Sequence, residues 1–232
     1  MNYKVMSIAK KFFKIFLRKV KRFFDWLVGD YSDELYWKYV HLLRKDLKNI
    51  CSNEEQIHRK FLINLILKNK NIKKILELGC GDGVNLKMIA KKNQFIDLYG
   101  IDINKTVIKR AISVINKFNF NIKLICGNMK NLEKYKNNEF DVVFTDAALM
   151  YADSRNIYKI LNEIFRVSRS KVFICEQHTD GAHFYNDKWV HNYKEIINRI
   201  SKNILIRIYK IKDNRSGDWE KFGKIIEVSK LN

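Results

Sequence analysis

The sequence contains no proline and only seven alanines, and its 45 basic residues comprise 34 lysines and 11 arginines. Together with many Asn and Ile residues, this profile is typical of a genome biased toward A and T, which raises the lysine content throughout. A net charge of +20 would otherwise indicate a nucleic-acid or membrane partner. Arginine, the residue suited to bidentate phosphate and base contacts, is not enriched. The charge alone therefore does not favour nucleic acid as the partner.

Cysteine is sparse and scattered, with no C-x-x-C pair and no zinc-ligand spacing among Cys51, Cys80, Cys126 and Cys175. Reduced thiols in a cytoplasmic protein are the simplest interpretation. No apolar run approaches the roughly 18–20 residues that a membrane span requires. Lysines also interrupt any signal-peptide core, and no small-residue cleavage site follows.

Residues 1–28 are predicted to form a basic amphipathic helix. Polar positions recur there at steps of three and four, and eight Lys or Arg against Asp25 alone leave a charge of about +7. The opposite face carries Trp26 and five phenylalanines, which is the profile of a helix that lies in a membrane interface. We therefore expect peripheral contact of residues 4–27 with the anionic inner face of a membrane. An ordinary helix packed on the domain or on a dimer partner is the alternative.

A second helical segment is expected over residues 29–70. Its first part, 33–39, is rich in aromatic rings, and residues 57–67 have the apolar spacing of a helix. Residues 71–232 then form the main domain. We see no repeat and no low-complexity linker that would separate a further independent fold.

The most informative stretch follows the apolar run 72–78. Glycine occupies every second position there, at Gly79, Gly81 and Gly83. This pattern is typical of a buried parallel strand that ends in a turn passing very close to a ligand. Residues 84–92 look like a helix, whose N-terminus can hold a carboxylate or phosphate. The spacing differs from the G-x-G-x-x-G fingerprint of dinucleotide-binding proteins.

The pattern E-x-G-x-G-x-G resembles motif I of the class I S-adenosylmethionine-dependent methyltransferases. Asp102 closes a second apolar run 25 positions after Glu77, near the spacing at which an acidic residue holds a pair of ribose hydroxyls. A third strand at 122–126, with Asn128 where the family often has Asp, and a fourth at 140–146 follow in order. The resemblance covers residues 71–230 and implies S-adenosylmethionine as the cofactor. It also implies a set of cofactor-binding residues: Glu77, Gly79, Cys80, Gly81, Gly83, Asn85, Asp102, Ile103, Asn128, Met129 and Thr145.

The resemblance implies an α/β fold, with a Rossmann-like, seven-stranded, mostly parallel sheet flanked by helices and an N-terminal helical extension. The remaining pattern predicts a helix capped by Ser154, a fifth strand at 171–176 and a helix over 189–200. A final antiparallel pair is expected at 204–211 and 222–228. In methyltransferases that look like this one, N-terminal helices lie over the cofactor and help to form the substrate cavity.

The loops after the fourth and fifth strands should take the substrate, because ligands bind beyond the carboxyl ends of parallel strands. Transfer to a hydroxyl requires removal of a proton. The candidate bases, in order, are His178, Glu176 and His191, and Tyr151 stands where many relatives carry a histidine. An orienting or solvent-facing role is the alternative for each. The spacing of Glu176, His178 and His183 matches no rigid ligand motif, so no metal is expected.

We predict a methyltransferase that acts on a hydroxyl or amine of a small molecule or glycan precursor. Residues 173–178 and 189–194 are similar to methyltransferases of bacterial surface-polysaccharide clusters. The alternative is RNA methylation. Against it, the tetrad 145–148 is not of the N-P-P-Y type, the Pro-Cys motif is missing, and no RNA-binding module is recognisable. A membrane-bound cofactor-binding protein without catalysis is a third hypothesis, which the intact motif I disfavours.

Overall fold

The computed structural model describes residues 54–231 except 55, 186–187 and 212–217. All of these residues belong to one compact unit, Lys48–Asn232. The predicted basic helix at 1–28, and the predicted helical segment 29–70 as far as residue 53, lie outside the described residues. Among the helices of the described residues, none has the length and hydrophobicity that a membrane span requires.

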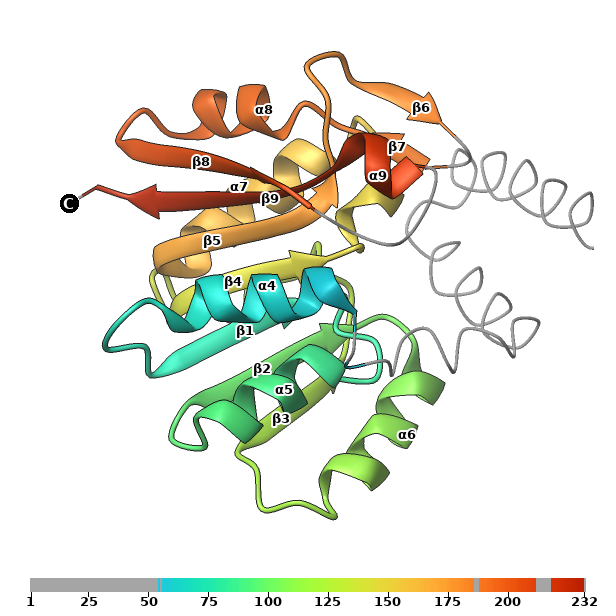
Figure 1. The fold of residues 1–232 in the computed structure, drawn as a ribbon, viewed down its shortest axis with the longest axis vertical. Coiled ribbons are helices and arrows are strands. Elements are labelled where there is room, and N and C mark those ends of the chain that lie inside the picture. The colour runs from blue at the N-terminus through green and yellow to red at the C-terminus, as the bar shows by residue number, and fades with distance from the viewer. Residues whose placement is uncertain (1–53, 55, 186–187, 212–217, 232) are drawn as a thin grey trace, which may run out of the picture. The chain divides into compact units, whose positions relative to one another are not determined.

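A seven-stranded sheet forms the centre of this unit (Figure 1), in the order β3-β2-β1-β4-β5-β9-β8. Strands β1 to β5 run parallel, and β9 is antiparallel to both of its neighbours. This confirms the predicted seven-stranded, mostly parallel sheet. The bounds are β1 (Lys74–Leu78), β2 (Asp97–Asp102), β3 (Ile122–Cys126), β4 (Phe140–Asp146), β5 (Ser168–Gln177), β8 (Ile204–Lys210) and β9 (Gly223–Lys230).

Helices cover both faces of the sheet, because the central strands are apolar on both sides. Figure 1 shows α4 (Ile57–Leu67) and α5 (Val84–Lys92) in front of the sheet and α7 (Ile157–Val167) behind it. The face under α4 and α5 buries Ile75, Phe144 and Phe173. The face under α7 buries their alternating neighbours, such as Leu76 and Val143. The described residues also form the α-helices α6 (Lys105–Ile115), α8 (Tyr193–Ile200) and α9 (Asp218–Phe222).

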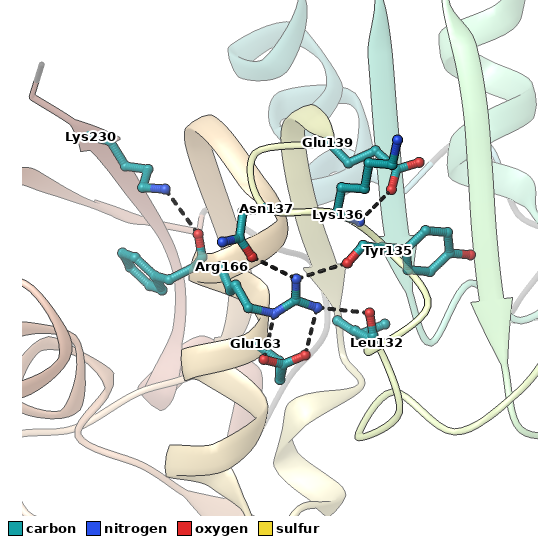
Figure 2. A network of polar contacts seen from close by, with 9 residues as sticks. Leu132, Tyr135, Lys136, Asn137, Glu139, Glu163, Arg166 and Lys230 are labelled. Carbon is teal, nitrogen blue, oxygen red and sulfur yellow. Dashed lines mark hydrogen bonds and ion pairs between the residues drawn. The ribbon is translucent and has the colours of Figure 1, made fainter.

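Arg166, at the end of α7, ties this helix to the connection between β3 and β4 (Figure 2). Its guanidinium donates to the backbone oxygens of Leu132 and Tyr135, each at 2.8 Å, and to Asn137 Oδ1 at 2.9 Å. The Glu163 carboxylate, one turn earlier, accepts the remaining N–H groups at 2.7 and 2.9 Å. Three of the five hydrogen bonds of this planar group thus order a connection that has little regular structure of its own, and the two to Glu163 hold the guanidinium in place.

Two of the predicted elements differ in the structure. The helix expected over 189–200 begins only at Tyr193, because Asn192 caps α8 by accepting the Glu195 N–H at 3.1 Å. The residues before it form β7 (Lys188–Val190), which pairs antiparallel with β6 (His183–Tyr185). The predicted cap at Ser154 is wrong as well. Asp153 Oδ1 accepts the N–H groups of residues 155 and 156, and α7 starts at Ile157.

Candidate functional site

The glycine loop after β1 has a backbone that other residues adopt only rarely. Gly79, Gly81 and Gly83 have φ angles of 71°, 53° and 74°, all in the left-handed region. A Cβ on Gly79 would lie 2.3 Å from Ala148 Cβ, whereas a Cβ on Gly81 would meet nothing within 4 Å. The first glycine is therefore required by packing, and the second faces open space. This loop has positive φ angles and open space at its second glycine, and it leads into the N-terminus of α5. A ligand can therefore approach its backbone closely.

Asp102, at the end of β2, lies beside this loop. Its Oδ2 accepts the Gly81 N–H at 2.9 Å, and its Oδ1 accepts the Asn104 N–H at 2.8 Å. Burial raises the pKa of Asp102, and the two N–H groups offset part of this shift. Ile103 follows directly, and its backbone oxygen accepts a weak Cys126 Sγ hydrogen bond at 3.6 Å. The predicted acidic residue thus lies against the open glycine of the loop.

The ends of β3 and β4 converge on the same place. The Gly127 N–H donates to the Asp102 backbone oxygen at 2.9 Å, which joins the end of β3 to that of β2. Asn128 turns the chain there by accepting the Lys130 N–H at 3.0 Å, and Met129 Cε would lie 3.8 Å from a Cβ on Gly79. Thr145, on β4, is fully buried beside β1. Most of the predicted cofactor residues therefore surround one loop.

Beneath the loop lies a buried polar cluster whose two carboxylates share one amide. Asn85 Nδ2 donates to Glu77 Oε1 at 2.7 Å and to Asp146 Oδ2 at 3.1 Å. From the start of α4, His58 Nε2 lies 3.3 Å from Asp146 Oδ1, and Arg59 Nε donates to Asp146 Oδ2 at 3.3 Å. The cluster therefore joins α4, β1, α5 and β4.

The pKa values of the two carboxylates in this cluster are shifted in opposite directions. Burial raises the pKa of Glu77 well above its usual value, and the hydrogen bond from Asn85 offsets only part of this. Burial alone would also raise the pKa of Asp146, but His58 and Arg59 hold it well below its usual value. Sequence reasoning missed Asp146, His58 and Arg59 as site residues. Asp146 gave a signal, because it is an acidic residue at the end of an apolar strand, whereas the residues of α4 gave none.

Glu176, a predicted candidate base, is fully buried near the end of β5. Its Oε1 accepts the N–H groups of Ala148 at 2.8 Å and Leu149 at 2.9 Å, and its Oε2 accepts that of Met150 at 3.3 Å. These N–H groups belong to the loop after β4, which contains the short helix η1 (Leu149–Tyr151). Burial raises the pKa of Glu176 to about 7.

The two other candidate bases, His178 and His191, are also buried, and they form a bridge between their backbones. His178 Nδ1 lies 3.2 Å from the His191 backbone oxygen and 3.3 Å from the Tyr193 backbone nitrogen. His191 Nε2 lies 2.9 Å from the Ala152 backbone oxygen. Burial lowers the pKa of both histidines. Tyr151, in η1, is 36% exposed. All four candidates therefore gather at the carboxyl ends of β4 and β5.

One side chain at this end escaped the sequence analysis. Gln177 is 0% exposed, and neither its Oε1 nor its Nε2 has a hydrogen-bond partner among the residues that the structure describes. It follows Glu176 on β5 and therefore points to the other face of the sheet. Unpaired buried amides are rare in native proteins, which marks Gln177 as a candidate ligand contact. Within residues 54–231, as far as they are described, no cluster of His, Cys, Asp and Glu could hold a metal ion.

Comparison with known proteins agrees with this geometry. The family described as "Methyltransferase domain" matches residues 69–227. A tRNA (guanine-N(7)-)-methyltransferase of Mycoplasma mobile is 25% identical over 154 residues, 63% of this chain and 77% of that protein. The enzyme of the same name from Mycoplasma genitalium is 41% identical over 64 residues, 26% of this chain and 30% of the relative. The chain thus spans less than a third of the length of that second relative.

A solved structure shares the fold at low sequence identity. It is the Burkholderia thailandensis 1,6-didemethyltoxoflavin-N1-methyltransferase with bound 1,6-didemethyltoxoflavin and S-adenosylhomocysteine. The TM-score is 0.67 at 11% identity, over 88% of this chain and 90% of that one. The open glycine loop and the contact of Asp102 with it agree with the match to the methyltransferase family. The chain belongs to the class I S-adenosylmethionine-dependent methyltransferases, and S-adenosylmethionine is its cofactor.

Proposed function

We propose that this enzyme methylates a hydroxyl or amine of a small molecule. The observation that carries this proposal is the burial of the polar groups at the carboxyl ends of β4 and β5. Glu176 and Gln177 are 0% exposed, His191 is 1% exposed and His178 is 7% exposed. Polar side chains that are buried near the strand ends suit a small acceptor, because a few such groups can orient a small ligand. The toxoflavin methyltransferase, whose fold is similar, binds a small molecule of this kind.

When bound, S-adenosylmethionine supplies a methyl group on a sulfonium sulfur. The remaining task for an acceptor hydroxyl is the removal of its proton, and His178 is our candidate for this. Its Nδ1 donates to the His191 oxygen in one tautomer and accepts the Tyr193 N–H in the other. The first tautomer leaves Nε2 as an acceptor for a proton. Burial lowers the pKa of His178, which keeps the ring neutral and able to act as a base.

The roles of the other candidates follow from their contacts. His191 lies between His178 and the Ala152 backbone oxygen and would orient His178. Tyr151 is the most exposed of the four candidates and would contact the acceptor directly. Gln177 offers both a donor and an acceptor and would fix the orientation of a ligand that presents the complementary pair.

Our prediction that the acceptor is a glycan precursor of a surface-polysaccharide pathway depends on residues 173–178 and 189–194. Contact with an anionic membrane depends on residues 4–27, which lie outside the described residues. The two predictions support each other, because glycan precursors are assembled at the inner face of an anionic membrane. Neither is needed for methylation of a small molecule.

The second candidate function is methylation of RNA. Two relatives are tRNA (guanine-N(7)-)-methyltransferases, and a net charge of +20 would favour contact with phosphates. We place it second because the M. mobile match has only 25% identity, and the higher-identity match is confined to 64 residues.

A labelling experiment separates the two candidates. Purified enzyme and methyl-labelled S-adenosylmethionine are added to an extract of the source cells, which is then divided into RNA, protein, lipid-glycan and small-molecule fractions. Label in the small-molecule or lipid-glycan fraction supports the first proposal and provides the acceptor for identification. Label in RNA instead would overturn it. With the acceptor in hand, His178→Ala should lower turnover while leaving the affinity for S-adenosylhomocysteine unchanged, and equal turnover would remove His178 as the base.

A further inference from the structure

The buried carboxylate of Glu176 is surrounded by backbone N–H groups. Its two oxygens accept from Ala148, Leu149 and Met150 at 2.8, 2.9 and 3.3 Å. Consecutive N–H groups that converge on one anion fix the path of the chain that carries them. This arrangement also leaves Glu176 no exposed oxygen with which to reach an acceptor. The carboxylate is thus built into the loop after β4.

That loop packs directly on the first glycine of motif I. A Cβ on Gly79 would lie 2.3 Å from Ala148 Cβ, so the Ala148 methyl group already fills the space above Gly79. Gly79 and Cys80 in turn donate their N–H groups to the Ile101 backbone oxygen at 2.8 and 3.1 Å. The position of Ala148 therefore helps to determine the path of the glycine loop, whose N–H groups are bonded to β2.

The loop after β4 also holds a conformation that an L-residue rarely adopts. Ala147 has a φ of 59°, in the left-handed region. Such a residue persists only where its surroundings over-determine it. Ala147 N–H donates to the Cys175 backbone oxygen at 3.0 Å on one side, and the Glu176 carboxylate binds the next three N–H groups on the other. Glu176 therefore supplies much of what keeps this conformation.

We propose that Glu176 is a positioning residue for the cofactor site. Its ionised carboxylate holds the loop after β4 against Gly79 and thereby keeps the glycine loop in the conformation that binds S-adenosylmethionine. This role concerns the cofactor, which family membership establishes, and it holds for any acceptor. Protonation would turn one carboxylate oxygen into an O–H group, which no longer accepts well from the backbone. The neutral form therefore holds the loop less firmly than the ionised form.

The surroundings of Glu176 make this change measurable near neutral pH. Burial raises its pKa to about 7; the N–H groups of Leu149 and Ala148 oppose this shift, and the charge of Asp146 adds to it. From α8, Tyr193 also faces Glu176, and burial raises the pKa of this phenol well above its usual value. His178 and His191 contact the Tyr193 ring, and burial lowers the pKa of both, which favours their neutral forms.

The test is a titration calorimetry series with S-adenosylhomocysteine and the full chain. If the ionised form binds better, affinity falls as the pH drops through the pKa of Glu176. We expect affinity about five- to tenfold weaker at about pH 6 than at about pH 8. Glu176→Gln mimics the neutral form and should bind at the weaker level across this range. Glu227→Gln is the matched control, because Glu227 is also a buried carboxylate, on β9, but faces Lys171 and Tyr209.

Three results would overturn the proposal. The first is a wild-type affinity that does not change across the series, which needs no variant and so does not depend on the folding of one. The second is a Glu176→Gln protein with the wild-type pH dependence, because another group would then be responsible. The third is loss of the pH dependence in Glu227→Gln, because any buried charge in the sheet would then have the same effect. None of these outcomes depends on which acceptor the enzyme uses.

Discussion

Replacing Asp102 by alanine should weaken the binding of S-adenosylhomocysteine without unfolding the protein. The carboxylate makes two backbone hydrogen bonds, to the Gly81 N–H at 2.9 Å and to the Asn104 N–H at 2.8 Å. Only the first holds the cofactor loop itself. A hydrogen bond to a charged group contributes about 1.5–3 kcal/mol, so if binding must reorder the freed loop, the loss of this contact weakens affinity by at most roughly 10- to 150-fold. Any direct contact of Asp102 with the ribose hydroxyls would add to this loss.

The assay is titration calorimetry with S-adenosylhomocysteine, together with thermal unfolding of each variant. Asp97→Ala serves as the control, because Asp97 lies at the other end of the same strand, away from the glycine loop. Asp102→Asn retains one acceptor oxygen and should fall between wild type and alanine. If Asp102→Ala binds within about threefold of wild type, then neither the loop contact nor the family's ribose contact applies to this residue.

Three other predictions concern parts of the molecule away from Asp102. Gln177→Met should raise the free energy of unfolding in urea by about 1 kcal/mol, because it removes a buried amide whose oxygen and nitrogen are both unpaired in the described part of the chain. A loss of stability of that size would show that the amide is paired in solution. Arg166→Met should lower the free energy of unfolding by about 2 kcal/mol, since it strands two backbone carbonyls, whereas the exposed Arg199→Met should change it by less than about 0.5 kcal/mol. Deleting residues 1–28 should abolish sedimentation with anionic liposomes and leave the affinity for S-adenosylhomocysteine intact. Sedimentation of the truncated protein would show that this segment is not the anchor.

The elements that the sequence predicted well are those with strong local signals. A few consecutive residues are enough to recognise each of the following: the glycine loop, the helix over 84–92, and the apolar strands at 72–78 and 140–146. The hairpin of β6 and β7 was missed, because Lys188–Val190 is short and continues into residues with helical spacing. Asn192 caps α8 on one side, and on the other side Trp189 pairs with Phe184 across the hairpin, a contact that the local sequence does not reveal.

By itself the sequence determined the succession of strands along the chain and the resemblance to the family, because apolar strands and a loop of alternating glycines depend on neighbouring residues. The order of the strands within the sheet came from the structure. Only the tertiary structure decided the roles of the polar side chains. Asp146 meets Arg59 across 87 positions, and Glu176 meets Ala148 across 28. Glu176 and Gln177 are neighbours in the chain, yet both oxygens of Glu176 are hydrogen-bonded whereas Gln177 has no partner among the described residues, because the two side chains point to opposite faces of one strand. Whether a carboxylate binds a ligand or holds a loop depends on what the fold brings to each of its oxygens, and no local pattern carries that information.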